Sequence, residues 1–151
     1  MPAGAPPKRA RPRTLAGYLE PLAHAMFQAG ISWRVVEAKW AGIKDALYGF
    51  DPERVAQLGP ADIDALMDDK RVIRNRAKLE AVVDNAQTML ELDSEHKGFR
   101  RYLQSFGNYD ETVADLKKQF RFVGDTGAYY FLHVVGEDVP SHEQWSAAHR
   151  R

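Results

Sequence analysis

The chain has 151 residues, which is enough for one domain that buries its own core without disulfides or metal ions. Its 21 basic and 21 acidic residues leave no net charge, which argues against a protein that coats nucleic acid through bulk charge, although a local basic face is compatible with it. Disulfides and thiolate metal sites are excluded because the chain has no cysteine, and we therefore expect a cytoplasmic protein. No apolar run approaches the roughly 20 residues that cross a membrane.

Residues 1–13 carry four prolines and four cations and too little apolar surface to order themselves. We predict a flexible basic tail here, followed by a single helical domain over residues 14–151. The tail could contact DNA phosphates or simply keep the chain soluble, and its composition favours neither.

A corner between two helices is predicted at residues 27–33, FQAGISW. An apolar repeat predicts a helix over 14–28, in which Pro21 either makes a kink or marks a late start. Gly30 suits the left-handed conformation that ends a helix, Ser32 is a good N-cap, and Trp33 begins a second helix that runs to about Tyr48. An indole at such a corner could form the wall of a pocket for a flat ligand or belong to the core.

Two short helices follow, one opened by the N-cap sequence DPE at 51–53 and one by GPAD at 59–62. A long helix is then predicted over about 72–92. Its polar side and the turn before it carry the densest basic cluster of the folded part, which is either a solvated face or a phosphate-binding patch. The cluster consists of Arg71, Arg74, Arg76 and Lys78.

The C-terminal third is predicted to contain a helix over about 99–106 and another that Asp110 caps and that ends near Gln119. A tight turn at 120–124 leads into a very apolar last helix. Backbone amides in such a turn, and at the start of the helix after it, can bind a phosphate, with Gly124 allowing close approach and Arg121 and Thr126 adding side-chain contacts. Because no stretch shows sustained alternation of apolar and polar residues, the predicted class is all-α.

Three stretches resemble, in order and spacing, the 3-methyladenine DNA glycosylase I family, a branch of the helix-hairpin-helix glycosylases. They are FQAGISW at 27–33, VIRNRAKL at 72–79 with Asn85 and Ala86, and FRFVGDT at 120–126 running on to His142. Together they span about residues 15–146. The resemblance implies a helix-hairpin-helix glycosylase fold that acts on double-stranded DNA and excises a flipped, alkylated base such as 3-methyladenine.

By this resemblance Trp33 takes the position that stacks on the base, with Gln28 and Ser32 beside it in the base pocket. A tryptophan face suits a cationic alkylated purine, through an attraction of about 0.5–2 kcal/mol. Pro140 stands where the larger superfamily carries its catalytic aspartate. The catalytic residue is therefore unknown, and Asp138 is the candidate that could replace it. We expect no cofactor.

The chain also departs from the family pattern. Ala25 stands where the family carries a glutamate that hydrogen-bonds the damaged base, and an alanine side chain cannot accept a hydrogen bond. Residues 1–17 have no counterpart of the family's aromatic lid. His142 matches one ligand of the family's zinc, but Ser146 replaces the cysteine, and His149 alone cannot complete a tetrahedral site. We therefore expect no metal.

Three functions stay open at this point: a divergent DNA glycosylase, a non-catalytic DNA-binding module that has lost base readout, and a scaffold that binds a protein partner through Tyr129, Tyr130 and Trp145. The retention of Trp33, Gln28 and the basic cluster favours the first two. Ala25, which stands in place of the glutamate that bonds the damaged base, favours the second. In each case we expect a monomer.

Overall fold

The computed structural model describes residues 9–149, and residues 1–8 and 150–151 lie outside the described part. The described residues form helices and no strand, which confirms the all-α prediction. In chain order the helices are α1 (Ala16–Gln28), α2 (Trp33–Ala46), the 3-10 helix η1 (Tyr48–Phe50), α3 (Pro52–Val55), α4 (Pro60–Met67), α5 (Arg76–His96), α6 (Phe99–Leu103), α7 (Tyr109–Gln119), α8 (Asp125–Val134) and α9 (His142–Ala148).

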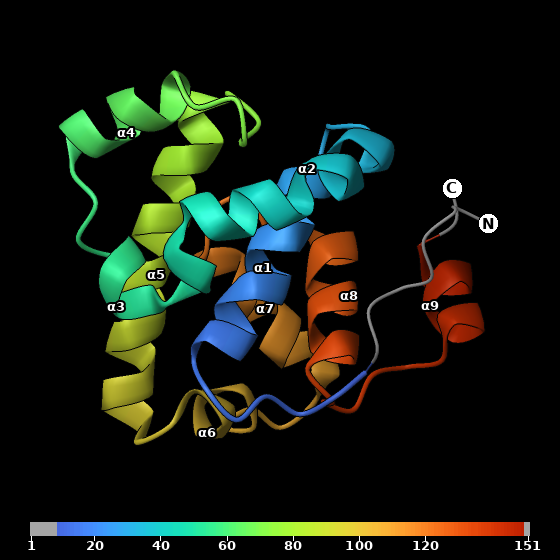
Figure 1. The fold of residues 1–151 in the computed structure, drawn as a ribbon. Coiled ribbons are helices and arrows are strands. Elements are labelled where there is room, and N and C mark those ends of the chain that lie inside the picture. The colour runs from blue at the N-terminus through green and yellow to red at the C-terminus, as the bar shows by residue number, and fades with distance from the viewer. Residues whose placement is uncertain (1–8, 150–151) are drawn as a thin grey trace.

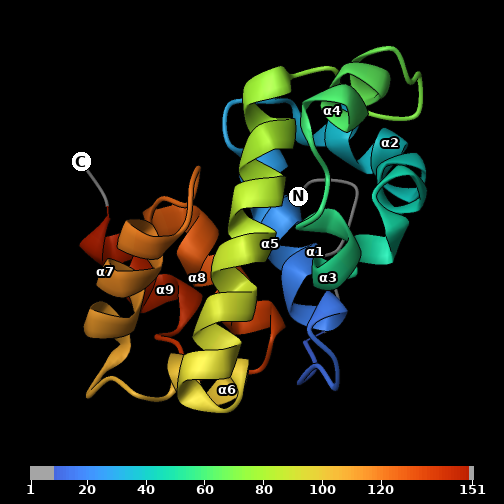
Figure 2. The ribbon, with the colours of Figure 1, turned by 90° about the vertical axis from the view of Figure 1, so that its left-hand side faces the viewer.

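Helix α5 is the longest element and forms the spine of the molecule (Figure 2). In this view α2, α3 and α4 lie on one side of it and α7, α8 and α9 on the other. Helix α1 contacts both α5 and α8 and so joins the two sides (Figure 1). Its apolar side is buried in one continuous core. The end of α1 and the beginning of α8 are therefore brought to the same region, although about 100 residues separate them in the chain.

Side-chain caps explain where two helices begin. The predicted long helix starts at Arg76 rather than Val72 because the side chain of Asn75 accepts a hydrogen bond from Lys78 N at 3.1 Å. In the same way Asn108, and not Asp110, caps α7 by accepting from Glu111 N at 2.9 Å. The first correction shifts the long helix by about four residues toward the C-terminus, and the second starts α7 about two residues earlier than predicted. The order of the helices is unchanged.

Backbone conformation explains where two other helices end. Helix α2 stops at Ala46, short of the predicted Tyr48, because Tyr48, Gly49 and Phe50 all have positive φ angles that an α-helix cannot contain. Helix α6 stops at Leu103, short of the predicted end at residue 106. Pro21 lies inside α1, which begins at Ala16, so this proline does not mark a late start.

The described part of the predicted N-terminal tail is attached to the end of α8. Ala10 N donates to Val134 O at 2.9 Å, and the guanidinium of Arg9 donates to His133 O and, at 2.7 Å, to Glu137 O. A cation is favourable at the C-terminus of a helix, where free carbonyl groups gather. Residues 9 and 10 of the predicted tail are thus bonded to the end of α8. Residues 1–8, where most of the prediction of a flexible tail falls, lie outside the described residues. None of the helices described is long and apolar enough to cross a membrane.

Candidate functional site

The predicted corner between the first two helices is present. Gly30 has φ 79°, the left-handed conformation expected where one helix ends and another begins. Ser32 occupies the N-cap position of α2, but its exposed side chain makes no capping hydrogen bond. Trp33 is half-buried in the first turn of α2, and the guanidinium of Arg34 lies 6.0 Å from its ring centroid. The indole is therefore partly open to solvent and available to a ligand.

The second predicted feature, the turn between α7 and α8, has an open helix start. Gly124 is the N-cap of α8 with φ −103°, a value open to any residue, and a Cβ built there would contact nothing within 4 Å. No side chain caps this helix, so the amide groups of its first turn are free to bind an anion. Phe122 in the same turn has φ 58° and is 42% exposed, an unusual conformation for a bulky residue.

A buried lysine joins these two features. Lys78 is only 5% exposed, and its ammonium group donates to Met26 O at 2.8 Å and to Ala29 O, at the C-terminal end of α1. The same ammonium lies 5.5 Å from the ring centroid of Phe122 in the α7–α8 turn. One side chain thus reaches both the helix corner and the turn, and burial lowers the pKa of this lysine.

Asn85, two turns further along α5, holds the same two elements. Its side-chain oxygen accepts from Arg121 N at 2.9 Å, and its amide nitrogen donates to Arg121 O at 3.0 Å and lies 3.0 Å from Met26 Sδ. The paired hydrogen bonds fix the α7–α8 turn against α5 and α1. Lys78 and Asn85 therefore place the helix corner and the turn at one end of the molecule.

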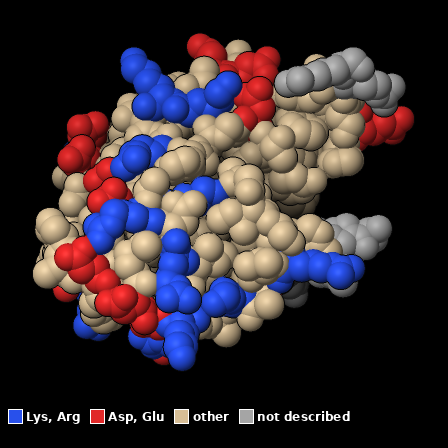
Figure 3. Space-filling view, turned by 90° about the horizontal axis from the view of Figure 1, so that it is seen from above, with Lys and Arg blue, Asp and Glu red and all other residues tan. Residues whose placement is uncertain are grey.

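The residues of the predicted basic cluster have different surroundings in the structure. Lys78 is buried, so its charge does not face solvent as a phosphate-binding group would. Arg74 is exposed and has no carboxylate partner among residues 9–149. The other cations form ion pairs: Arg71 with Asp69 and Asp45, Arg76 with Asp64 and Glu80, and Arg121 with Asp84. On the face shown in Figure 3, Lys and Arg side chains lie among Asp and Glu side chains.

Two residues near the end of α1 show how this helix packs at the corner. Ala25 faces α8, where a Cβ added to Gly127 would lie 3.5 Å from its own Cβ. Gln28 is half-buried, and its Nε2 donates to Glu37 Oε1 at 3.4 Å. Helices α1 and α8 thus approach each other closely at Ala25, the position where the family pattern carries a glutamate.

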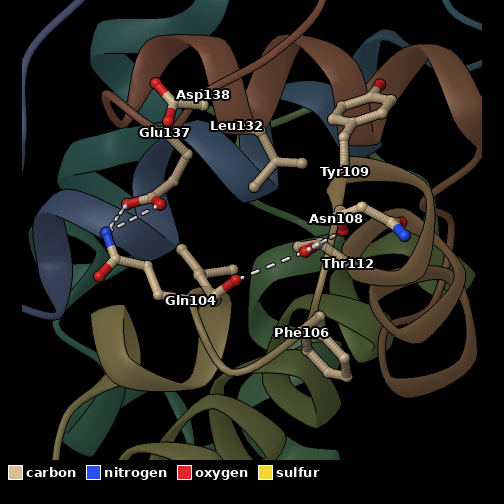
Figure 4. A pocket seen from close by; sticks show the side chains of 9 residues that line it. Gln104, Phe106, Asn108, Tyr109, Thr112, Leu132, Glu137 and Asp138 are labelled. Carbon is tan, nitrogen blue, oxygen red and sulfur yellow. Dashed lines mark hydrogen bonds between the residues drawn. The ribbon is translucent and has the colours of Figure 1, made fainter.

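Asp138 lies far from the corner. It follows α8, so it sits beyond the opposite end of that helix from Gly124. With Gln104 and Tyr109 it lines a surface hollow of about 250 Å³, shown in Figure 4, in which the buried carboxylate of Glu137 accepts from Gln104 Nε2 at 3.1 Å. Among residues 9–149 Asp138 forms no hydrogen bond or ion pair with Trp33, Gln28 or the α7–α8 turn.

The histidines near the C-terminus belong to α9 and the residue after it. Ser146 Oγ lies 3.5 Å from His142 Nδ1, and the indole of Trp145 stacks on Tyr129 with ring centroids 4.8 Å apart. Within residues 9–149 no three His, Cys, Asp or Glu side chains are grouped so that they could hold a metal ion. The Tyr129 and Trp145 surface, considered above for a protein partner, is used within the chain to attach α9.

Sequence reasoning found the corner and the turn but not what joins them. It assigned Lys78 to a surface patch and gave Asn85 no role beyond the family motif. A usable signal was present: the two residues are seven positions apart, and so lie on the same face of α5 as the core positions Leu79, Val82 and Ala86.

The fold is that of a class of DNA repair enzymes. The chain resembles the solved 3-methyladenine DNA glycosylase I of Staphylococcus aureus, with a TM-score of 0.72 and 28% identity over 83% of this chain and 78% of that one. A solution structure of a 3-methyladenine DNA glycosylase I gives a TM-score of 0.71 at 25% identity, covering 88% of each chain.

Sequence comparison specifies the family. Residues 15–119 match the model of the methyladenine glycosylase family. The chain is 33% identical to the DNA-3-methyladenine glycosylase of Haemophilus influenzae and 30% identical to DNA-3-methyladenine glycosylase 1 of Escherichia coli. Each alignment is 130 positions long and covers 72% of this chain and 70% of the relative. The chain belongs to the methyladenine glycosylase family.

Proposed function

We propose that the protein is a DNA glycosylase that removes alkylated adenine, with 3-methyladenine as its first substrate, from double-stranded DNA. The observation that carries this proposal is the joint contact of Lys78 with the α1–α2 corner and the α7–α8 turn. A flipped base at the corner and the phosphate backbone at the turn can then be held by one face of the protein. Family membership supports the substrate, since one of the similar solved structures is a glycosylase I in complex with 3-methyladenine.

The two halves of this site have different tasks. The half-buried indole of Trp33 stacks on the base that leaves the helix, with Gln28 and Ser32 at its side. The free amides at the start of α8, with Thr126 and Arg121, bind a backbone phosphate, and the unpaired cation of Arg74 adds attraction. We further propose that the protein acts as a monomer in the cytoplasm.

The reaction requires little acid–base catalysis from the protein. Water adds to C1′ of the deoxyribose while the bond from C1′ to the base breaks. The electron pair of that bond neutralises the positive charge of the alkylated base, and the proton of the water passes to solvent. The products are free 3-methyladenine and an abasic site. Binding and orientation supply the catalysis, and no step is assigned to Asp138.

The test is release of base from DNA treated with a methylating agent, followed by chromatography. We expect 3-methyladenine to be released by the wild-type protein and Trp33→Ala to lower the release rate about tenfold to a hundredfold, because base stacking on an aromatic ring is lost. Trp33→Phe keeps an aromatic face and should lie between the two. Binding to duplex DNA without release of any base, at high protein concentration, would instead favour the non-catalytic DNA-binding module.

A further inference from the structure

A row of polar side chains connects α1 to α2 beside the candidate base site. Glu20, His24 and Gln28 follow one another at intervals of four residues and so lie on one face of α1. At one end of the row Glu20 pairs with Lys44 at 3.0 Å and accepts from Trp40 Nε1 at 3.0 Å. At the other end, next to the corner, His24 and Gln28 both contact Glu37.

The position of Glu37 puts a carboxylate close to the predicted stacking residue. Glu37 is four residues after Trp33 and therefore on the same face of α2, one turn away. It also contacts Gln28, which is predicted to be a second residue of the base pocket. Its side chain is 42% exposed, so the carboxylate is held at the edge of the site rather than buried in the core.

The two oxygens of this carboxylate are used differently. Oε1 lies 2.5 Å from His24 Nε2 and 3.4 Å from Gln28 Nε2. Because a carboxylate only accepts hydrogen bonds, Nε2 of His24 is the donor in the contact with Oε1. Oε2 has no hydrogen-bond partner among residues 9–149. Glu37 is thus oriented through one oxygen while the other is free.

We propose that Glu37 is the acidic residue that recognises the flipped base, accepting a hydrogen bond through Oε2 from the amino group of an alkylated adenine. This inference rests on the proposed function and makes Glu37 a specificity-determining residue. An alkylated adenine carries both a positive charge and an exocyclic amino donor, and a carboxylate complements both. Ala25 offers no acceptor, so the acidic group comes from α2 instead of α1.

The alternative is that the contact of His24 with Glu37 merely ties α1 to α2. Glu20 provides a matched control, because it joins the same two helices through Trp40 and Lys44 but lies two turns away from Gln28. Glu37→Gln and Glu20→Gln each replace one carboxylate with an amide of the same shape. Only the first changes the charge beside Trp33.

The experiment measures four quantities for the wild type and both variants: the single-turnover rate of 3-methyladenine release from methylated duplex DNA, the affinity for free 3-methyladenine by calorimetry, the affinity for undamaged duplex, and Tm. We expect Glu37→Gln to lower the release rate and the affinity for the free base by about tenfold or more, because a charge-assisted hydrogen bond becomes a neutral one. Its duplex affinity and Tm should match those of Glu20→Gln, which should release base at the wild-type rate.

The possible failures differ from one another. Release and binding by Glu37→Gln at wild-type levels, or an equal loss in both variants, would overturn the role of Glu37 and leave the proposed glycosylase activity intact. A wild-type protein that releases no base but binds free 3-methyladenine, more weakly after Glu37→Gln, would support base recognition by Glu37 and overturn the proposed excision. A wild-type protein that neither releases nor binds the base would overturn both.

Discussion

The α7–α8 turn and helix α9 are held in different ways, and the difference indicates which residues the fold depends on. The α7–α8 turn is fixed by buried polar side chains of α5, each with well-placed partners. Helix α9 lies beside the first half of α8, where Trp145 stacks on Tyr129 and His149 Nε2 lies 3.8 Å from Asp125 Oδ2. It contributes no fully buried residue, and Tyr109 Oη and Trp145 Nε1 have no hydrogen-bond partner among the described residues. Hydrogen bonds inside a core allow one geometry, whereas ring stacking tolerates adjustment.

The two arrangements therefore predict different responses to substitution. Removing a buried polar group that has partners leaves those partners unpaired and is costly. Removing a polar group that has no partner costs little. Substitutions of the buried side chains that hold the α7–α8 turn should impair stability and, through the turn, DNA binding. Substitutions near α9 should impair neither.

The largest effect is expected for Lys78→Met. The substitution keeps the length and apolar stem of the side chain but leaves Met26 O and Ala29 O without their donor. We expect a loss of about 2–3 kcal/mol in the free energy of unfolding, the usual cost of losing hydrogen bonds from a charged group. Urea denaturation measures it.

Lys118→Met is the control for Lys78→Met, because Lys118 is exposed on α7 and forms no ion pair among the described residues. Its free energy of unfolding should stay within about 0.5 kcal/mol of the wild type. Equal stability of the two variants would mean that the buried ammonium does not hold the corner to the turn.

Asn85→Ala should have the next largest effect. The substitution removes both hydrogen bonds to the backbone of Arg121 and so frees the α7–α8 turn from α5. We expect a loss of about 1–3 kcal/mol in stability and a measurable fall in duplex affinity, because the turn no longer presents its amides in one orientation. Gln87→Ala, which removes an exposed amide from the same helix, should change neither. A stable Asn85→Ala protein with normal affinity would show that the turn keeps its conformation unaided.

Gly124→Ala separates binding from folding. The backbone angles of Gly124 suit alanine, and the added methyl group would meet no atom of the protein. We therefore expect an unchanged Tm and a fall in duplex affinity of about tenfold, because the methyl group occupies space in front of the amides that bind phosphate. Fluorescence anisotropy at two salt concentrations measures the affinity.

Gly59→Ala is the matched control for Gly124→Ala. Gly59 is also a helix N-cap with an extended backbone and free space around it, but it opens α4, away from the turn. Its duplex affinity should equal that of the wild type. An equal fall in both variants would mean that the start of α8 has no special role in DNA binding.

The contrast also explains how much of the fold and site could be predicted from the sequence. Gly30, Trp33 and the turn at 120–124 were found because short-range signals mark helix ends, and the order of the helices follows from apolar periodicity. The tasks of Lys78, Asn85 and Glu37 were missed because each depends on contacts with residues far away in the chain. A lysine among charged neighbours looks like a surface residue until the fold gives it carbonyl partners.

The smallest effect is expected for Tyr109→Phe, the test beside Tyr129 and α9. The phenol of Tyr109 is buried without a hydrogen-bond partner among the described residues, so its removal takes away no hydrogen bond. At neutral pH we expect a free energy of unfolding within about 0.5 kcal/mol of the wild type, or slightly higher. A clear loss of stability would show that the phenol has a partner, and that the α7–α8 turn and α9 are held in more similar ways than the geometry indicates.

The pH dependence of Tyr109 sharpens that test. Burial raises the pKa of this phenol to about 12 from an ordinary value of 10.0. A group whose pKa is raised on folding stabilises the protein fully below its ordinary pKa, and this contribution is lost as the pH rises through the folded value. Between these two values the wild type should therefore lose more stability than Tyr109→Phe, so that urea midpoints measured at about pH 11 favour the variant more than those measured at about pH 7. Parallel loss in both proteins would mean that the phenol titrates as it does in the unfolded chain, and that α9 leaves it open to water.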